Sequence, residues 1–164
     1  MALNTEKRTL PKNDVPKDVY FMKAALKEAK KAARIGEVPV GAVIEYKGKL
    51  YAKGYNKRIC SKDPTAHAEL VAIKKAAKKL GDWRLKDMTL YVTTEPCLMC
   101  CGAIIHSRLK RVVYGCVEPK MGAIKSLYNV FNTKAHHLPV IEGDVLSKES
   151  IQLLKDFFKQ LRQN

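Results

Sequence analysis

The stretch Asp63-Pro-Thr-Ala-His-Ala-Glu-Leu70 is followed about thirty residues later by Thr93-Thr-Glu-Pro-Cys-Leu-Met-Cys-Cys-Gly102. Each stretch leads into a helical pattern, and each brings metal-ligating side chains to the start of its helix. Because two helix starts can converge on one point, the pair predicts a shared metal ion. The ion could either stabilise the fold or hold a reactive water.

Cys97 and Cys100 form a Cys-x-x-Cys pair, in which two thiolates one helical turn apart can reach the same zinc ion. Pro96 suits the entrance of the helix, and the free amides there stabilise negative sulfur. Alone, such a pair also suits a redox couple or half of a structural four-cysteine site, but the sequence has no second Cys-x-x-Cys. Five cysteines, an odd number, argue against a disulfide framework.

His67 is the sensible third ligand, and three protein ligands leave a fourth position open. An open position is typical of catalytic zinc, whose bound water ionises near pH ~7. Glu69 can look past the end of its helix toward that water without being a ligand, and so serve as an acid and base. Singly, His67 would be interpreted as a core histidine and Glu69 as an acid at a helix start. Together with the two cysteines they favour a catalytic zinc.

Hydrophobic periodicity predicts one α/β domain. Helical spacing begins at Val19 and closes before Gly36, and two β-prone runs at 40–44 and 49–52 flank a turn typical of a hairpin. Further expected elements are a helix at 66–80, a strand at 89–93, a helix at 96–108, strands at 111–115 and 139–141, and a helix from 148. Leu70, Ile73, Ala76, Ala77 and Leu80 are expected to face inward. The strand, helix, strand order implies a parallel crossover in a mixed sheet between helical layers.

Composition points to a folded protein with a polyanionic partner. The 164 residues are 46% hydrophobic and 29% charged, and 31 Lys and Arg against 16 Asp and Glu give a net charge of +15. The alternative is a lysine-rich surface that only confers solubility, and the cluster Lys74, Lys75, Lys78 and Lys79 is interpreted as such a solvated face. The substrate class cannot be read from charge alone.

No signal-peptide pattern and no run of about 18 apolar residues appears, so we expect a cytoplasmic protein that does not enter a membrane. Residues 1–17 mix charge with Pro11 and Pro16 and have no apolar period. We expect them to form a flexible N-terminal extension, followed by a single domain at 18–164.

The His-Ala-Glu at 67–69 followed by Pro-Cys-x-x-Cys at 96–100 resembles the zinc-dependent nucleobase deaminase superfamily. EVPVGAV at 37–43, DPTAHAE at 63–69, EPCLMC at 95–100 and the late FFKQLR are similar to bacterial tRNA-specific adenosine deaminases, over roughly residues 18–164. The resemblance implies a cytidine deaminase-like α/β/α sandwich in three layers, with a central mixed five-stranded sheet, and a homodimer. It also implies hydrolytic conversion of the wobble adenosine of a tRNA anticodon loop to inosine, with release of ammonia.

Residue by residue, the resemblance assigns His67, Cys97 and Cys100 as ligands of one Zn²⁺ per subunit and Glu69 as the proton shuttle. It requires no redox or nucleotide cofactor. Asn56 matches a residue that hydrogen-bonds the flipped base or its sugar, although an Asn in a polar turn is also ordinary.

An anticodon loop offers unstacked bases and a run of phosphates to a basic surface. We expect Lys120, Lys159 and Arg162 to contact phosphates and Phe157 to add a stacking surface, with one of Phe157 and Phe158 in the core.

Several positions depart from the family's usual pattern. Cys101 and Lys125 stand where small residues are usual, and Cys101 is expected to be a packed thiol by its helical phase. Cys116-Val117-Glu118 replaces an alanine and polar or acidic residues, commonly Asp at position 118. Glu118 is expected beside the substrate's sugar, where RNA is distinguished from DNA.

Three alternatives stay open. An altered or engineered relative could deaminate adenosine or cytidine in single-stranded DNA, which the sequence around Glu118 motivates. A deaminase of free guanine or cytosine would share the zinc signature but would have no need of a strongly basic surface. A non-catalytic nucleic-acid-binding module with structural zinc would fill all four zinc positions, and Cys101 is the nearest spare ligand.

Overall fold

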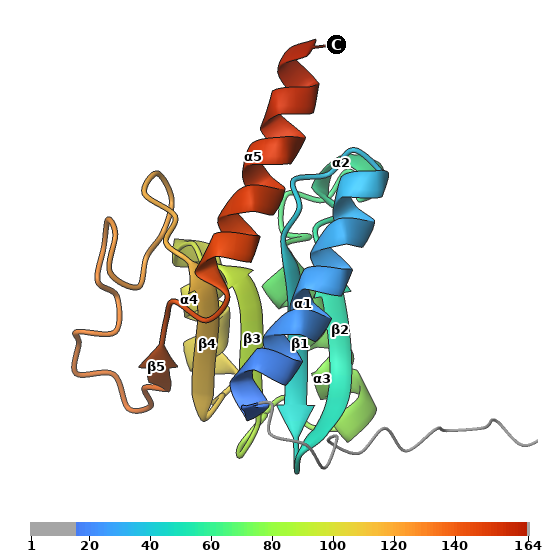
Figure 1. Ribbon diagram of the computed structural model, residues 1–164. Helices are drawn as coiled ribbons and strands as arrows, with labels where there is room; N and C mark the ends of the chain where they lie inside the picture. Colours follow the sequence, from blue (N-terminus) through green and yellow to red (C-terminus); the bar gives the residue numbers. More distant parts are fainter. Residues whose placement is uncertain (1–15, 164) are drawn as a thin grey trace, which may run out of the picture.

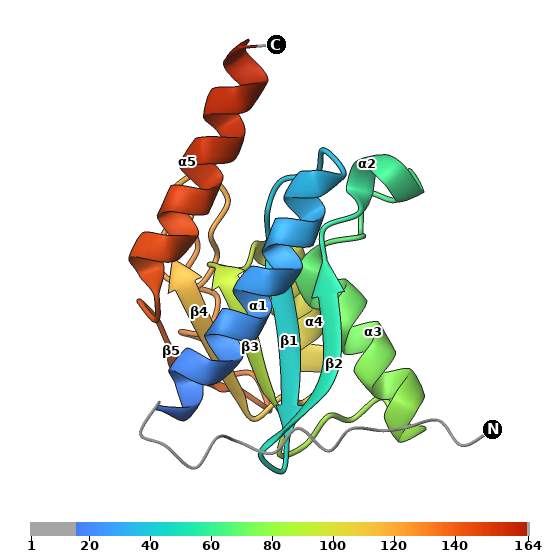
Figure 2. The same ribbon diagram turned by 45° about the vertical axis from the view of Figure 1, so that its right-hand side comes forward.

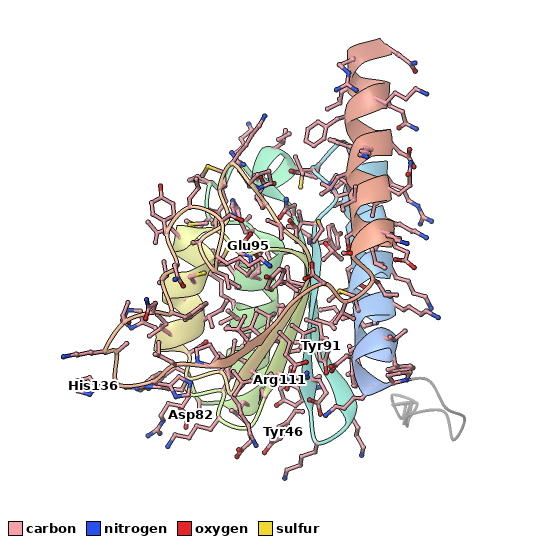
Figure 3. All side chains as sticks on the ribbon, turned by 60° about the vertical axis from the view of Figure 1, so that its left-hand side comes forward. Tyr46, Asp82, Tyr91, Glu95, Arg111 and His136 are labelled. Carbon is pink, nitrogen blue, oxygen red and sulfur yellow. The ribbon has the colours of Figure 1, made fainter. Side chains whose placement is uncertain are left out.

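The computed structural model describes residues 16–163 of the chain. Its elements are α1 (Lys17–Arg34), β1 (Gly41–Tyr46), β2 (Lys49–Tyr55), α2 (Arg58–Ser61), α3 (Ala68–Leu80), β3 (Thr89–Thr94), α4 (Leu98–His106), β4 (Arg111–Cys116), β5 (Val140–Glu142) and α5 (Ser147–Gln163). A five-stranded sheet lies between α1 and α5 on one face and α3 and α4 on the other (Figures 1 and 2). Figure 3 shows these three layers with the sheet nearly edge-on. The predicted α/β/α sandwich is confirmed.

The strand order is β2-β1-β3-β4-β5. β1 pairs antiparallel with both β2 and β3, whereas β3, β4 and β5 run parallel to one another. The sheet is therefore mixed, and α4 makes the predicted crossover between β3 and β4. Because β3 and β4 are parallel, the loops that follow them leave the sheet at the same end.

Alternating side chains of the central strands fill two cores, one on each face of the sheet. On the α1 side, Phe21, Met22 and Ala25 pack against Val43 and Tyr91. The α3 and α4 side holds the larger cluster. Helices approach the sheet closely at glycine: a Cβ added at Gly41 would lie 2.0 Å from the Ala25 carbonyl oxygen, and one at Gly54 would lie 2.4 Å from that of Ala68.

An ion-pair network fastens the start of α1 to the sheet. Arg111 donates to both carboxylate oxygens of Asp18 at 2.7 Å and also contacts Glu142, while the Tyr91 hydroxyl donates to Asp18 at 2.7 Å. The hydrogen bond from Arg111 holds the pKa of Asp18 below its ordinary value, and burial raises the pKa of Tyr91. Tyr91 and Arg111 lie side by side on the strands in Figure 3.

The structure differs from the sequence expectations at three places. Helix α1 begins at Lys17, inside the expected extension, whose residues 1–15 lie outside the described part. Helix α2 was not predicted. In α3, Leu70 is only half-buried and Leu80 is exposed. Ala68 and Ala72 join the core instead, because α3 approaches Gly54 so closely that only small side chains fit there. None of the helices between residues 16 and 163 is both long enough and apolar enough to cross a lipid bilayer.

Candidate active site

The three predicted ligands meet where two helices begin. His67 is the N-cap residue of α3 and Cys97 that of α4, and neither side chain caps its own helix. The Nδ1 atom of His67 lies 3.6 Å from the Sγ atoms of both Cys97 and Cys100. Zinc bonds of about 2.0–2.1 Å to nitrogen and about 2.3 Å to sulfur, at a tetrahedral angle, separate the two atoms by about 3.6 Å. The donor set therefore fits zinc.

The two thiols are electrostatically unequal before a metal binds. A hydrogen bond from Cys100 lowers the pKa of Cys97 to about 4, and the same contact raises the pKa of the Cys100 thiol. A hydrogen bond with Cys97 also raises the pKa of His67. Cys97 is thus prepared as a thiolate, and a zinc ion held by both sulfurs would displace the proton of the Cys100 thiol.

Glu69 lies in the first turn of α3 and is 3% exposed. Its carboxyl group contacts the Cys100 thiol, and burial raises its pKa to about 6. The ligand atoms of His67, Cys97 and Cys100 lie within 4.8 Å of one another, and Glu69 is outside this group. Glu69 is therefore a buried acid outside the group of candidate ligand atoms, and its role as a non-ligand acid stays a prediction.

Asn56 fixes the start of α3 to the end of β2. Its Oδ1 accepts a hydrogen bond from the Ala68 N–H at 3.0 Å, and its Nδ2 donates to the Val38 carbonyl at 3.1 Å. Asn56 thus orients the backbone next to His67. The Nδ2 group carries a second hydrogen, which can serve a ligand.

Cys101 does not belong to the ligand group. Its side chain is buried in the larger core, and its thiol donates to the Pro96 carbonyl at 3.7 Å. The expectation of a packed thiol is confirmed. In the described part of the chain, the structural-zinc alternative therefore lacks its nearest fourth ligand.

A groove of about 840 Å³ runs between α5 and the chain that follows β4. Four residues expected to contact nucleic acid line it together: Glu118, Lys120, Lys159 and Arg162. The two phenylalanines need a correction, because Phe157 is 7% exposed whereas Phe158 is 42% exposed and lines the groove. Phe157 instead lies beside Ala33 of α1. Phe158 is the side chain that a ligand in the groove would meet.

Sequence reasoning gave no role to two buried acids that organise the surroundings of the metal position. Glu37 accepts the backbone N–H groups of Ile59 and Cys60 at 2.7 and 2.9 Å, and so holds α2. Glu95, at the end of the sheet next to the start of α4 in Figure 3, accepts backbone N–H groups from the 118–126 segment. Burial raises the pKa of Glu95, but these hydrogen bonds outweigh it and leave the pKa below its ordinary value. The sequence signal that could have indicated these roles is that each acid opens a recognisable motif, Glu37 in EVPVGAV and Glu95 in EPCLMC.

Comparison with known proteins agrees with this geometry. Residues 15–116 match the family model of the cytidine and deoxycytidylate deaminase zinc-binding region. The tRNA-specific adenosine deaminase of Bacillus subtilis (strain 168) is 45% identical over 88% of this chain and 91% of its own length. A solved structure from work on A-to-I editing by tRNA:A34 deaminases at the wobble position matches with a TM-score of 0.80 and 40% identity, over 82% of this chain and 99% of that one. A guanine deaminase from Nitrosomonas europaea shares the fold, with a TM-score of 0.78 at 23% identity over 94% of this chain and 88% of that one.

Proposed function

The chain belongs to the cytidine and deoxycytidylate deaminase family and, within it, to the tRNA-specific adenosine deaminases, and from this premise we propose that it converts the wobble adenosine of a tRNA anticodon loop to inosine. The observation that carries the proposal is the grouping of three candidate ligand atoms with a buried acid that lies outside the group. A structural site would need no such acid.

His67, Cys97 and Cys100 would hold one zinc ion, which when bound lowers the pKa of a coordinated water to about 7 and so supplies the nucleophile. Glu69 takes the proton of the attacking water and delivers it to the ring nitrogen next to the amine-bearing carbon. Glu69 then takes the second proton, from the hydroxyl now on that carbon, and passes it to the exocyclic amine, so that the C=O bond forms while the C–N bond breaks and ammonia leaves. One water is consumed, and adenosine becomes inosine. Asn56 stands at the start of α3, where its free amide hydrogen can orient the base.

The groove along α5 supports a polynucleotide as the substrate. Lys120, Lys159 and Arg162 supply positive charge to follow phosphates, and the exposed ring of Phe158 supplies a face on which an unpaired base can stack. The net charge of +15 favours the approach of RNA from a distance. Glu118 lines the same groove, and we propose that it faces the sugar of the target or of a neighbouring nucleotide.

A homodimer and a cytoplasmic location complete the proposal. Leu98 and Met99 of α4 are 51% and 38% exposed, directly beside the ligand Cys97. Apolar side chains at this position suit contact with a second copy of the chain. Because tRNA is the proposed substrate, we propose a cytoplasmic location, with residues 18–164 acting as a single domain.

The test uses the zinc-loaded protein and measures ammonia release from an anticodon stem-loop with adenosine at the wobble position. Parallel reactions contain the matching DNA loop, a stem-loop with cytidine at the same position, and free adenine, guanine and cytosine. We expect release from the adenosine RNA. Release from the DNA loop alone would support the altered relative that acts on DNA, and release only from a free base would contradict the proposal.

A further inference from the structure

One buried carboxylate holds an entire segment of the rim of the groove. Glu95 is 1% exposed. Its Oε1 accepts the N–H groups of Ile124, Lys125 and Ser126 at 3.0, 2.8 and 3.0 Å. Its Oε2 accepts the Glu118 N–H at 3.0 Å and also the Ser126 hydroxyl. Hydrogen bonds to an ionised carboxylate are about twice as strong as neutral ones, so this set defines the conformation of the segment 118–126, here termed the rim loop.

The rim loop is also joined to the turn that carries the metal ligand Cys97. The Ala123 N–H donates to the Pro96 carbonyl at 2.9 Å, and Gly122 forms an isolated β-bridge with Cys97. Glu95 itself is anchored to β4 through its N–H, which donates to the Cys116 carbonyl at 2.8 Å. The carboxylate therefore couples the rim loop to the metal position and to the sheet.

The outer side of the rim loop faces the groove. Glu118 and Lys120 line the groove, and the Glu118 carboxylate in turn accepts the Lys120 N–H at 2.9 Å. The direction of both side chains thus depends on a loop shape that Glu95 maintains from beneath. The Glu95 carboxylate is buried under that loop and is not among the groove-lining residues.

We propose that Glu95 is a positioning residue for RNA: it holds the rim loop in the conformation that grips the nucleotides next to the target. The proposal rests on the proposed function in taking the anticodon loop as the ligand. Glu95 acts on the affinity for RNA through Glu118 and Lys120, and takes no part in the proton transfers assigned to Glu69.

Gly122 provides independent support, because the contact between the rim loop and Glu95 leaves no room for a side chain there. A Cβ added at Gly122 would lie 2.4 Å from Oε2 of Glu95 and 2.5 Å from the Glu118 carbonyl oxygen. The glycine is thus required by packing against the carboxylate, and Gly122→Ala should displace the rim loop without changing Glu95 itself.

The experiment measures RNA affinity in a Glu69→Ala background, so that the substrate stays intact. Binding of the anticodon stem-loop is compared for Glu69→Ala, Glu69→Ala/Glu95→Gln and Glu69→Ala/Gly122→Ala, all loaded with zinc. In Glu95→Gln, an amide NH2 group replaces one carboxylate oxygen. This group donates hydrogen bonds and therefore cannot accept those of the rim-loop N–H groups. We expect affinity to fall about tenfold in both double variants, in line with the loss of bonds to a charged group. Zinc content should stay at one ion per chain.

Two further measurements separate positioning from general destabilisation. Hydrogen exchange at the amides of Ile124, Lys125 and Ser126 should accelerate in both double variants. With Glu69 intact, Glu95→Gln should raise KM for the stem-loop about tenfold and leave kcat within about twofold. The matched control is Glu28→Gln, which changes a carboxylate that is also buried but pairs with Lys31 on α1 and should leave KM unchanged.

Unchanged RNA affinity in both double variants, with faster exchange of the rim-loop amides, would overturn the proposal. Loss of zinc in both variants would also overturn it, because Glu95 would then support the ligand turn instead. If the unsubstituted protein releases no ammonia from the stem-loop, the proposed function fails. The binding and exchange measurements still decide the role of Glu95 in that case.

Discussion

The Nδ1 atom of His67 lies 3.6 Å from the Sγ atom of Cys100, although 33 positions separate the two residues in the sequence. The contact arises because α3 and α4 begin at the same end of the sheet. N-cap side chains commonly accept a hydrogen bond from their own helix. Those of His67 and Cys97 do not, and both point to a common metal position instead.

Replacement of Glu69 should separate catalysis from metal binding. Because Glu69 lies outside the ligand group, Glu69→Ala should retain one zinc per chain while kcat falls by about 10²-fold or more, as expected for loss of a general acid and base. Metal analysis of the purified protein alongside ammonia release provides the measurement. Loss of zinc together with loss of the folded state would show that Glu69 is structural.

The adjacent phenylalanines of α5 should give opposite phenotypes. Phe157 is buried against α1, so Phe157→Ala should lower the free energy of unfolding by about 3–5 kcal/mol. Phe158 is exposed in the groove, so Phe158→Ala should leave stability nearly unchanged and weaken binding of the anticodon stem-loop by about 1–3 kcal/mol through lost stacking. Urea unfolding and RNA titration of both variants check this pair, and unaltered RNA binding in Phe158→Ala would exclude stacking on that ring.

The ion pair between Asp18 and Arg111 should make stability depend on pH. The pKa of Asp18 is lowered in the folded state, so its contribution is complete above the unfolded value of about 3.9 and is lost as the pH falls through the folded pKa. At pH ~7, Asp18→Asn should lower the free energy of unfolding by about 1.5–3 kcal/mol. The difference from the unsubstituted protein should be constant down to about pH 5 and shrink below about pH 4.

Urea unfolding across that pH range tests the expectation. The control is Asp82→Asn, which removes an exposed ion pair with Arg84 and should leave stability nearly unchanged. An equal effect of the two substitutions, or one that persists without change at low pH, would show that the Asp18 pair contributes nothing specific.

Alanine at Gly41 should be severely destabilising, although Gly to Ala usually stabilises where the backbone permits it. The new methyl carbon would lie 2.0 Å from the Ala25 carbonyl oxygen and 2.3 Å from the Ala29 nitrogen, so α1 would have to move off the sheet. We expect a loss of about 3 kcal/mol or more. Thermal unfolding of Gly41→Ala measures it, and a Tm within about 2 °C of the original would show that the α1 layer yields freely.

The helices and strands with a strong hydrophobic period were predictable from sequence, and so were the three ligands, because two motifs at helix starts restrict where their side chains can meet. Helix α2 was not predictable, because Arg58–Ser61 has no apolar period and is held by Glu37, 22 positions away from Ile59. The role of Glu95 was not predictable either, because its hydrogen-bond partners lie 23 to 31 positions further along the chain.

The choice between Phe157 and Phe158 also required the structure. Adjacent side chains on a helix point about 100° apart. The sequence does not show which of the two phenylalanine side chains faces α1. Leu80 shows the converse limit: its spacing in α3 suits an inward position, but it is the last residue of the helix and its side chain is exposed.

The anchoring of two surface segments by buried acids has an evolutionary consequence. Glu37 holds α2 and Glu95 holds the segment 118–126 through hydrogen bonds from backbone N–H groups, whereas the candidate metal ligands are carried by the starts of α3 and α4. Substitutions in either segment can therefore change the surface near the metal position without altering the residues that would hold the ion.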